Sequence, residues 1–248
     1  MTEEPHYYRP DRKIRFIMSF GILGVLAAVV FIIFLALPFD QFVTAIILLG
    51  IYMCPGFGKE SIIPAMLGGG HILEALENIG IYIELSIPLN GFPLWIILLG
   101  IVAIDMTLAI IISYNFDLLL RVPLLGKVLG LFTDKMTVLL DKKPWIKGLA
   151  SAGLFLFMFI PFMGSSAIDT SIIGRIISMH PKILLPIVFF GSVLATLVMA
   201  VGVNVVINLW MANPFLALAA IAGAIIIGVV IWKLWRKYIT PRFAKKEN

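Results

Sequence analysis

The sequence predicts an all-α polytopic membrane protein, with four transmembrane helices and two oppositely oriented re-entrant helical hairpins that form an inverted repeat. Three observations predict this class. The 248 residues are 61% apolar and 13% charged, with a mean hydropathy of +1.06. The apolar residues form runs of two different lengths, and the charged residues between these runs are sorted by sign. We therefore expect residues 1–248 to form a single membrane domain.

Four apolar runs are long enough to cross a bilayer as helices. A helix rises about 1.5 Å per residue, so about 20 apolar residues cover a hydrocarbon core of about 30 Å. The runs that meet this length are residues 16–37, 93–113, 183–209 and 214–234. The first run is too long for the apolar core of a signal peptide, and we expect it to remain as an anchor.

Two other apolar regions, residues 42–70 and 149–179, are each divided by a break rich in glycine and proline. The breaks are marked by Pro55, Gly58 and Pro64 in the first region and by Pro161 and Gly164 in the second. Each half is too short to span a membrane, which is typical of a re-entrant hairpin. A single kinked span is the alternative interpretation of each region. A broken backbone at membrane depth must be packed in protein or line a wet cavity.

Charge placement predicts the topology. Lysine and arginine predominate in residues 9–15, 117–147 and 233–246, whereas residues 39–92 contain five acidic residues and one basic residue, Lys59. Basic segments stay on the cytoplasmic side, so both termini and the central segment are expected there, in a multi-pass protein of the plasma or inner membrane. With four crossings this holds only if neither broken region crosses. The two hairpins must then enter from opposite faces.

Three cytoplasmic segments follow from this topology. They are a tail at residues 1–15, an amphipathic helix at 121–147 and a basic tail at 235–248. In the amphipathic segment the charges fall on one helical face and apolar residues on the other, which is typical of a helix lying along a membrane surface.

The two breaks share a sequence pattern. A Pro-x-x-Gly sequence at 55–58 is followed by Ser-Ile-Ile at 61–63, and the same two elements recur at 161–164 and 171–173. Each broken region is then followed by a full span. This arrangement is typical of an inverted repeat, in which the substrate site lies near the midplane between the hairpin tips.

Ionisable side chains at membrane depth are the candidate site residues. A charge at the centre of a membrane helix costs about 3 kcal/mol on translocon scales, so each one needs a partner, water or a function. The candidates for substrate or ion coupling are Glu60, Asp169, Arg175, Lys59 and Asp105.

Each candidate has more than one interpretation. We predict that Glu60 and Asp169 form a coupling pair for protons or a small cation, because carboxylates in a helix break can hold either. The alternative is that Glu60 pairs with Lys59 or Arg175 to close the core. Asp105 fits a proton relay or a satisfied polar group bonded to hairpin backbone. Arg175 fits binding of an anionic headgroup or phosphate, capping of a half-helix, or an inward-snorkelling side chain.

Three stretches carry a resemblance to a known family: GKESIIPAMLGGG (58–70), RVPLLGKVLGLF (121–132) and GLASAGLFLFMFIPFMGSSA (148–167). In order and spacing, over roughly residues 45–205, they resemble the small multidrug export protein family, which is similar to the DedA/VTT group of membrane transporters. The resemblance implies a two-hairpin fold and movement of lipid-like substrates, in some members coupled to protons.

The sequence also departs from these families. Glu60 stands where the export family has arginine, and Met163 and Ser166 replace a proline and a glycine of its second break. DedA-type proteins carry two arginines around the second break, and the matching positions here are Met158 and Gly164. Arg175 is the only basic residue left in that hairpin.

The expected function is that of a secondary-type transporter or flippase for an amphiphilic or lipid-like anion, with proton coupling through the hairpin carboxylates. An uncoupled lipid scramblase, a membrane insertase and a small-molecule (multidrug) exporter are alternatives. The sequence lacks HExxH, GxSxG and P-loop motifs, and Cys54 is its single cysteine, so we expect no enzyme activity, no metal and no cofactor. The expected partners are membrane lipids, a lipid-phosphate or other amphiphilic substrate, and protons or a small cation. No nucleic acid is expected, and homo-oligomerisation is left open.

Overall fold

The computed structural model describes residues 10–54, 57–78, 91–120, 145–158 and 167–213, with scattered positions between 215 and 233. The chain divides into two compact units, Met1–Ala200 and Val201–Asn248. All regular structure in the described residues is α-helical, as predicted. The helices are α1 (Arg12–Ala36), α2 (Phe39–Tyr52), α3 (Lys59–Asn78), α4 (Leu94–Leu120), α6 (Trp145–Phe157), α7 (Ala167–Ile176) and α8 (Pro181–Ala212), which continues into the second unit.

Within the described residues, three helices are long and apolar enough to cross a membrane. They are α1, α4 and α8, and they contain most of the predicted runs 16–37, 93–113 and 183–209. The all-α class and these three long apolar helices are therefore confirmed, and they are compatible with a membrane protein. About half of the predicted fourth span at 214–234 lies outside the described residues, and its described positions are helical. Most of the predicted segments 1–15, 121–147 and 235–248 also lie outside them.

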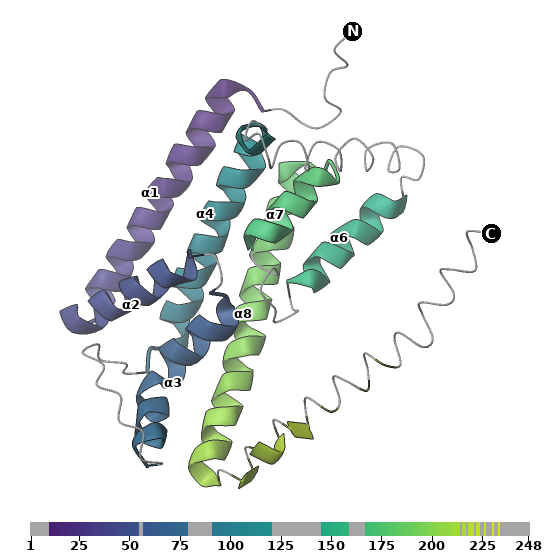
Figure 1. The fold of residues 1–248 in the computed structure, drawn as a ribbon. Helices are drawn as coiled ribbons and strands as arrows, with labels where there is room; N and C mark the ends of the chain where they lie inside the picture. The colour runs from purple at the N-terminus through teal and green to yellow at the C-terminus, as the bar shows by residue number, and fades with distance from the viewer. Residues whose placement is uncertain are drawn as a thin grey trace. The chain divides into compact units, whose positions relative to one another are not determined.

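Helix α4 is the central element of the first unit. Its most apolar stretch is 67% buried, against 11% for α1. Helices α1, α2, α3 and α7 all contact α4, and Figure 1 shows α1 alongside it. The outer face of α1 carries exposed Phe16, Phe20 and Phe31, which is the surface expected of a helix that faces lipid.

Helices α2 and α3 are separated by a break that contains Gly58, as predicted. Pro55 lies outside the described residues, and Pro64, expected to mark the break, lies inside α3 instead. Helix α3 runs antiparallel to α4. Its first residue, Lys59, contacts Asp105 in the middle of α4, whereas the carbonyl of Met66 accepts a hydrogen bond from the backbone N–H that precedes α4 by two residues.

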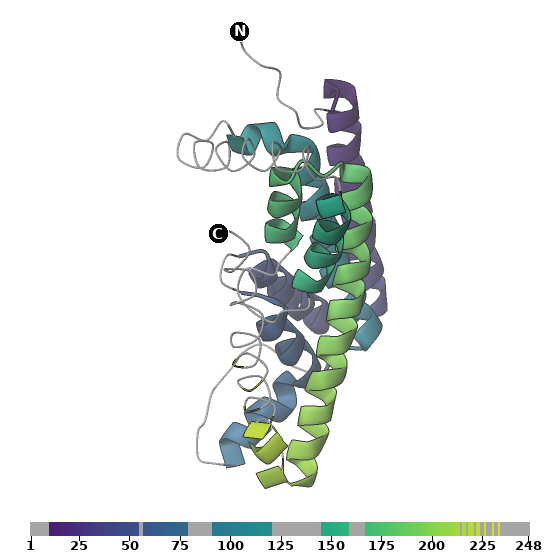
Figure 2. The same ribbon diagram turned by 90° about the vertical axis from the view of Figure 1, so that its right-hand side faces the viewer.

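Helices α6 and α7 flank the second predicted break. Residues 159–166, with its predicted markers Pro161 and Gly164, lie outside the described residues. At the start of α7, Ala167 shares a buried cluster with Ala109 of α4, and further along α7 the Arg175 guanidinium lies over the Phe116 ring. Helix α7 therefore runs parallel to α4. Helices α3 and α7 begin near the middle of α4 and extend towards its opposite ends, as Figures 1 and 2 show.

Close packing of α2 on α4 depends on Gly100, which leads to a stability prediction. A Cβ atom added at Gly100 would lie 2.8 Å from Cδ1 of the buried Leu49 side chain. Gly100→Leu is expected to lower the free energy of unfolding by about 1–3 kcal/mol, because overpacking displaces neighbouring side chains. Thermal unfolding in detergent measures the loss. Gly24→Leu, at a position with no neighbour within 4 Å, is the control and should cause no loss.

Candidate functional site

Asp105 is the centre of a buried polar cluster halfway along α4. Its side chain is 1% exposed. The Tyr52 hydroxyl donates a hydrogen bond to Oδ1 at 2.6 Å, and the Ser192 hydroxyl donates to Oδ2 at 2.5 Å. Lys59 Nζ lies 2.8 Å from the same Oδ2. Side chains from α2, α3 and α8 thus meet on one carboxylate. These side chains supply its hydrogen-bond donors, whereas one interpretation of the sequence expected donors from hairpin backbone.

Lys59 links the first helix break to this cluster. It is the first residue of α3, and its ammonium also donates a hydrogen bond to Ser192 Oγ at 3.1 Å. Lys59, Ser192 and Asp105 therefore form a closed triangle of polar contacts. A buried ion pair recovers its desolvation cost only when its geometry is good and further hydrogen bonds satisfy its remaining groups.

The helical period of each element brings these side chains together. On α2, Ala45, Leu49 and Tyr52 are buried and share one face, so the Tyr52 hydroxyl points towards α4. On α8, Val188, Ser192 and Thr196 recur every four residues along the buried face. On α4, Asp105 continues the line of buried Ile101, one turn before it. The polar groups replace apolar ones on faces that are otherwise packed core.

Glu60 lies beside this cluster but is not part of its ion pair. It occupies the first turn of α3, is half-buried, and lies near Tyr52. Within the described part of the chain, the Glu60 side chain has no hydrogen bond or ion pair. Lys59, the adjacent cation, pairs with Asp105. The interpretation in which Glu60 pairs with Lys59 is therefore wrong.

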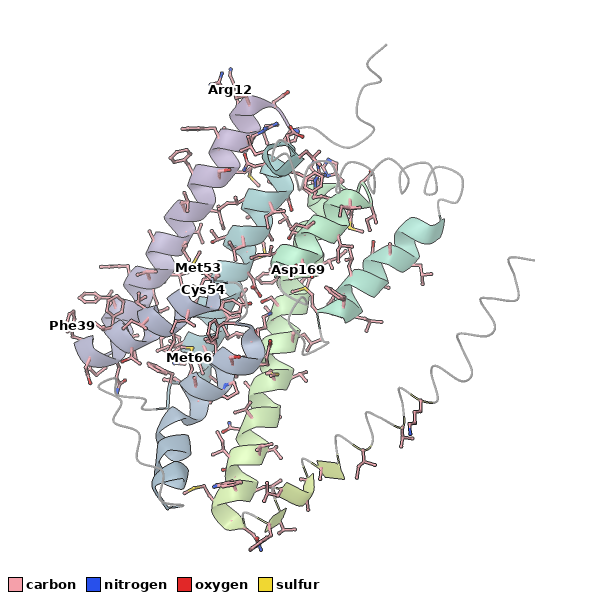
Figure 3. The ribbon with its side chains drawn as sticks, in the orientation of Figure 1. Arg12, Phe39, Met53, Cys54, Met66 and Asp169 are labelled. Carbon is pink, nitrogen blue, oxygen red and sulfur yellow. The ribbon has the colours of Figure 1, made fainter. Side chains whose placement is uncertain are left out.

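Asp169 lies in the first turn of α7, as Glu60 lies in the first turn of α3. Each is the acidic residue of the first turn after a break, where a carboxylate interacts favourably with the helix dipole. Figure 3 shows Asp169 at about the same height as Met53 and Cys54, which follow α2. Functional coupling of Glu60 with Asp169 stays a prediction.

Arg175 lies at a different level from the Asp105 cluster. It is 1% exposed, its Nη1 donates to the Met179 carbonyl at 3.0 Å, and its guanidinium carbon lies 5.6 Å from the Phe116 ring centroid. Phe116 is eleven residues beyond Asp105, or about 17 Å along the axis of α4. The guanidinium therefore contacts the turn that follows α7, and the structure does not bring Arg175 to Lys59 and Asp105.

The end of α6 also approaches the cluster, through α8. Gly191 precedes Ser192, and a Cβ atom added at Gly191 would lie 2.6 Å from the sulfur of Met158, just after α6. Ser192 therefore contacts Lys59 at the start of α3, and the adjacent Gly191 lies against Met158 at the end of α6. Glycine at 191 permits this close approach.

Sequence reasoning missed Tyr52 and Ser192. A tyrosine and a serine within apolar runs are common, and no short spacing connects them to Asp105, which lies 53 positions from Tyr52 and 87 from Ser192. The local signals of the cluster were two charges in apolar sequence: Lys59, directly after a glycine-rich break, and Asp105.

No protein-family model matches this chain, and neither does any curated protein or solved structure. The resemblance to small multidrug export proteins therefore stays a prediction, and the geometry of the Asp105 cluster is the basis for assigning a function.

Proposed function

We propose that this chain is a secondary-type membrane transporter or flippase for an amphiphilic or lipid-like anion. The observation that carries the proposal is the Lys59–Asp105 ion pair, buried at a helix break beside an apolar helix long enough to span a membrane. Well-packed apolar residues of similar volume are often at least as stabilising as a buried ion pair. Ionisable residues inside membrane helices mark substrate or ion pathways. A role beyond stability is the better explanation of this pair.

The backbone supports the two-hairpin form of this proposal. In it, α2 with α3 and α6 with α7 are re-entrant hairpins from opposite faces of the membrane, related as an inverted repeat. Helices α3 and α7 extend from the middle of α4 towards opposite ends, as this topology requires. Four crossings, with both termini cytoplasmic in a plasma or inner membrane, complete the proposal.

The proposed substrate site lies where the first break meets α4 and α8. Half-helix ends near a membrane midplane bind ions and charged substrate groups in transporters of this plan. Lys59 supplies the positive charge that an anionic headgroup requires. The carboxylates of Glu60, Asp169 and Asp105 are the candidates for coupling to protons or a small cation.

A vesicle assay tests the proposed function. The purified chain is reconstituted in liposomes with fluorescent phosphatidylglycerol, and transbilayer movement is followed with and without an imposed pH gradient. We expect the gradient to drive net movement above that in protein-free vesicles. Gradient-independent equilibration would indicate a scramblase, a chemically altered lipid would indicate an enzyme, and no movement of any anionic amphiphile would overturn transport. Each of these outcomes contradicts the proposal.

A further inference from the structure

We propose that Lys59 binds the ligand, exchanging the Asp105 carboxylate for a singly charged oxyanion on an amphiphile, and that Asp105 takes up one proton in this exchange. This inference rests on the proposed function and defines the ligand chemistry and the proton site within it. The oxyanion is a phosphodiester, carboxylate or sulfonate, since all three present oxygen acceptors to an ammonium.

The ammonium is the accessible end of the ion pair. The Lys59 side chain is 12% exposed, whereas Asp105 is 1% exposed. An ammonium has three N–H donors, and its partners among the described residues, Asp105 and Ser192, account for two. A ligand that approaches along the helix break therefore meets Lys59 before it meets Asp105.

Thr196 provides a second donor that the described fold does not use. Its side chain is fully buried, and its hydroxyl has no hydrogen-bond partner among the described residues. Thr196 lies one turn beyond Ser192 on the same face of α8. Leaving a buried hydroxyl unsatisfied costs about 1–3 kcal/mol. An oxyanion held by Lys59 could also accept hydrogen bonds from Thr196 and Ser192, which would recover that cost.

Charge balance requires a proton. Among the described residues, Lys59 is the charged group in contact with Asp105, and Glu60 lies nearby, close to Tyr52; Tyr52 from α2 and Ser192 from α8 are neutral. The site carries one positive and two negative charges, a sum of −1. Binding of a monoanion alone would change the net charge of the site to −2 in a medium of low dielectric constant. Binding of a monoanion together with a proton leaves the net charge at −1.

The hydrogen bonds can rearrange without breaking a covalent bond of the protein. A proton from water binds Asp105 Oδ2, and Lys59 stays protonated. The resulting carboxyl group donates to Ser192 Oγ, whose hydroxyl rotates towards the ligand, while Tyr52 keeps its bond to Oδ1. The ammonium is then left with the oxyanion as its counterion.

Proton uptake on ligand binding tests the inference directly. The full chain in phosphatidylcholine nanodiscs is titrated with decanesulfonate, and binding is measured by calorimetry with a pH-indicator dye in weakly buffered solution. A sulfonate stays ionised across the working pH range, so any proton taken up binds to the protein. We expect about one proton to be taken up per bound sulfonate. The Kd should then rise about tenfold for each unit increase in pH, over the range in which Asp105 is ionised before the ligand binds.

Three variants separate the roles of the residues. Asp105→Asn should bind decanesulfonate without proton uptake and without pH dependence. The double variant Lys59→Gln/Asp105→Asn removes both charges of the ion pair together and should fold but not bind. Thr196→Val should weaken binding about three- to tenfold, the loss of one hydrogen bond. Asp117→Asn changes the other buried acid of α4 and is the matched control. It should keep both binding and proton uptake, because Asp117 lies twelve residues from Asp105 and pairs with Arg15 of α1.

Several results would overturn the inference. Sulfonate binding without proton uptake would do so, as would proton uptake that survives Asp105→Asn or is lost in Glu60→Gln. Inorganic sulfate that binds as tightly as decanesulfonate would show that the ligand is a free oxyanion and not an amphiphile. Lipid movement without proton uptake would contradict this inference alone. Proton-coupled sulfonate binding without movement of any anionic amphiphile in vesicles would contradict the proposed transport alone.

Discussion

Replacing Lys59 by methionine is expected to lower the free energy of unfolding by about 3–5 kcal/mol near neutral pH. The substitution keeps the bulk of the side chain but leaves the Asp105 carboxylate buried without its counterion, and a buried charge that loses its partner is strongly destabilising. Thermal unfolding of the purified chain in detergent, followed by tryptophan fluorescence, measures the loss.

Two comparisons identify the cause of this loss. Acidification should restore part of the stability of Lys59→Met, because it neutralises the orphaned carboxylate. The double variant Lys59→Met/Asp105→Asn should recover most of the loss at all pH values, since neither charge is then buried. If the single variant is as stable as the unmodified chain at neutral pH, the two charges are not a buried pair.

Replacing Arg175 by methionine is expected to lower the free energy of unfolding by about 2–4 kcal/mol. Arg175 is among the largest fully buried side chains, so its loss leaves the Met179 carbonyl without this donor and removes the guanidinium from the Phe116 ring. The same unfolding measurement applies.

The control for this variant is Arg12→Met, at an exposed arginine near the start of α1. It should change stability by less than about 0.5 kcal/mol. Arg175→Lys should recover only part of the loss, because an ammonium cannot stack on the ring as a guanidinium does. Equal stability of the Arg175→Met and Arg12→Met proteins would contradict the structural role.

Local signals in the sequence predicted much of the fold. Length and hydropathy identify α1, α4 and α8, because the bilayer thickness acts on each helix separately. The break before Lys59 was predictable because one proline and two glycines fall within the four residues 55–58, and such a cluster disfavours a continuous helix. Pro64 was assigned less well. It lies within α3, and a proline in a membrane helix is tolerated where neighbouring groups satisfy the backbone.

The site was predictable only in part. Lys59 and Asp105 were identifiable as charges within apolar sequence, but their pairing depends on how α3 packs against α4. Glu60 follows Lys59 directly, and pairing of these two was the alternative to a Glu60–Asp169 coupling pair. Consecutive residues of a helix point in different directions, however, and the ammonium reaches α4 without meeting Glu60. Tyr52 and Ser192 carried no signal before the helices were placed in space.

The central claim is that the Lys59–Asp105 pair moves an anionic amphiphile across the membrane. The most direct measurement is the pH-gradient-driven movement of fluorescent phosphatidylglycerol by the Lys59→Gln/Asp105→Asn variant in liposomes, compared with the unmodified chain at equal reconstituted amounts. We expect the variant to unfold at a similar temperature and to show no movement above protein-free vesicles. Movement at the unmodified rate by the folded variant would contradict the claim.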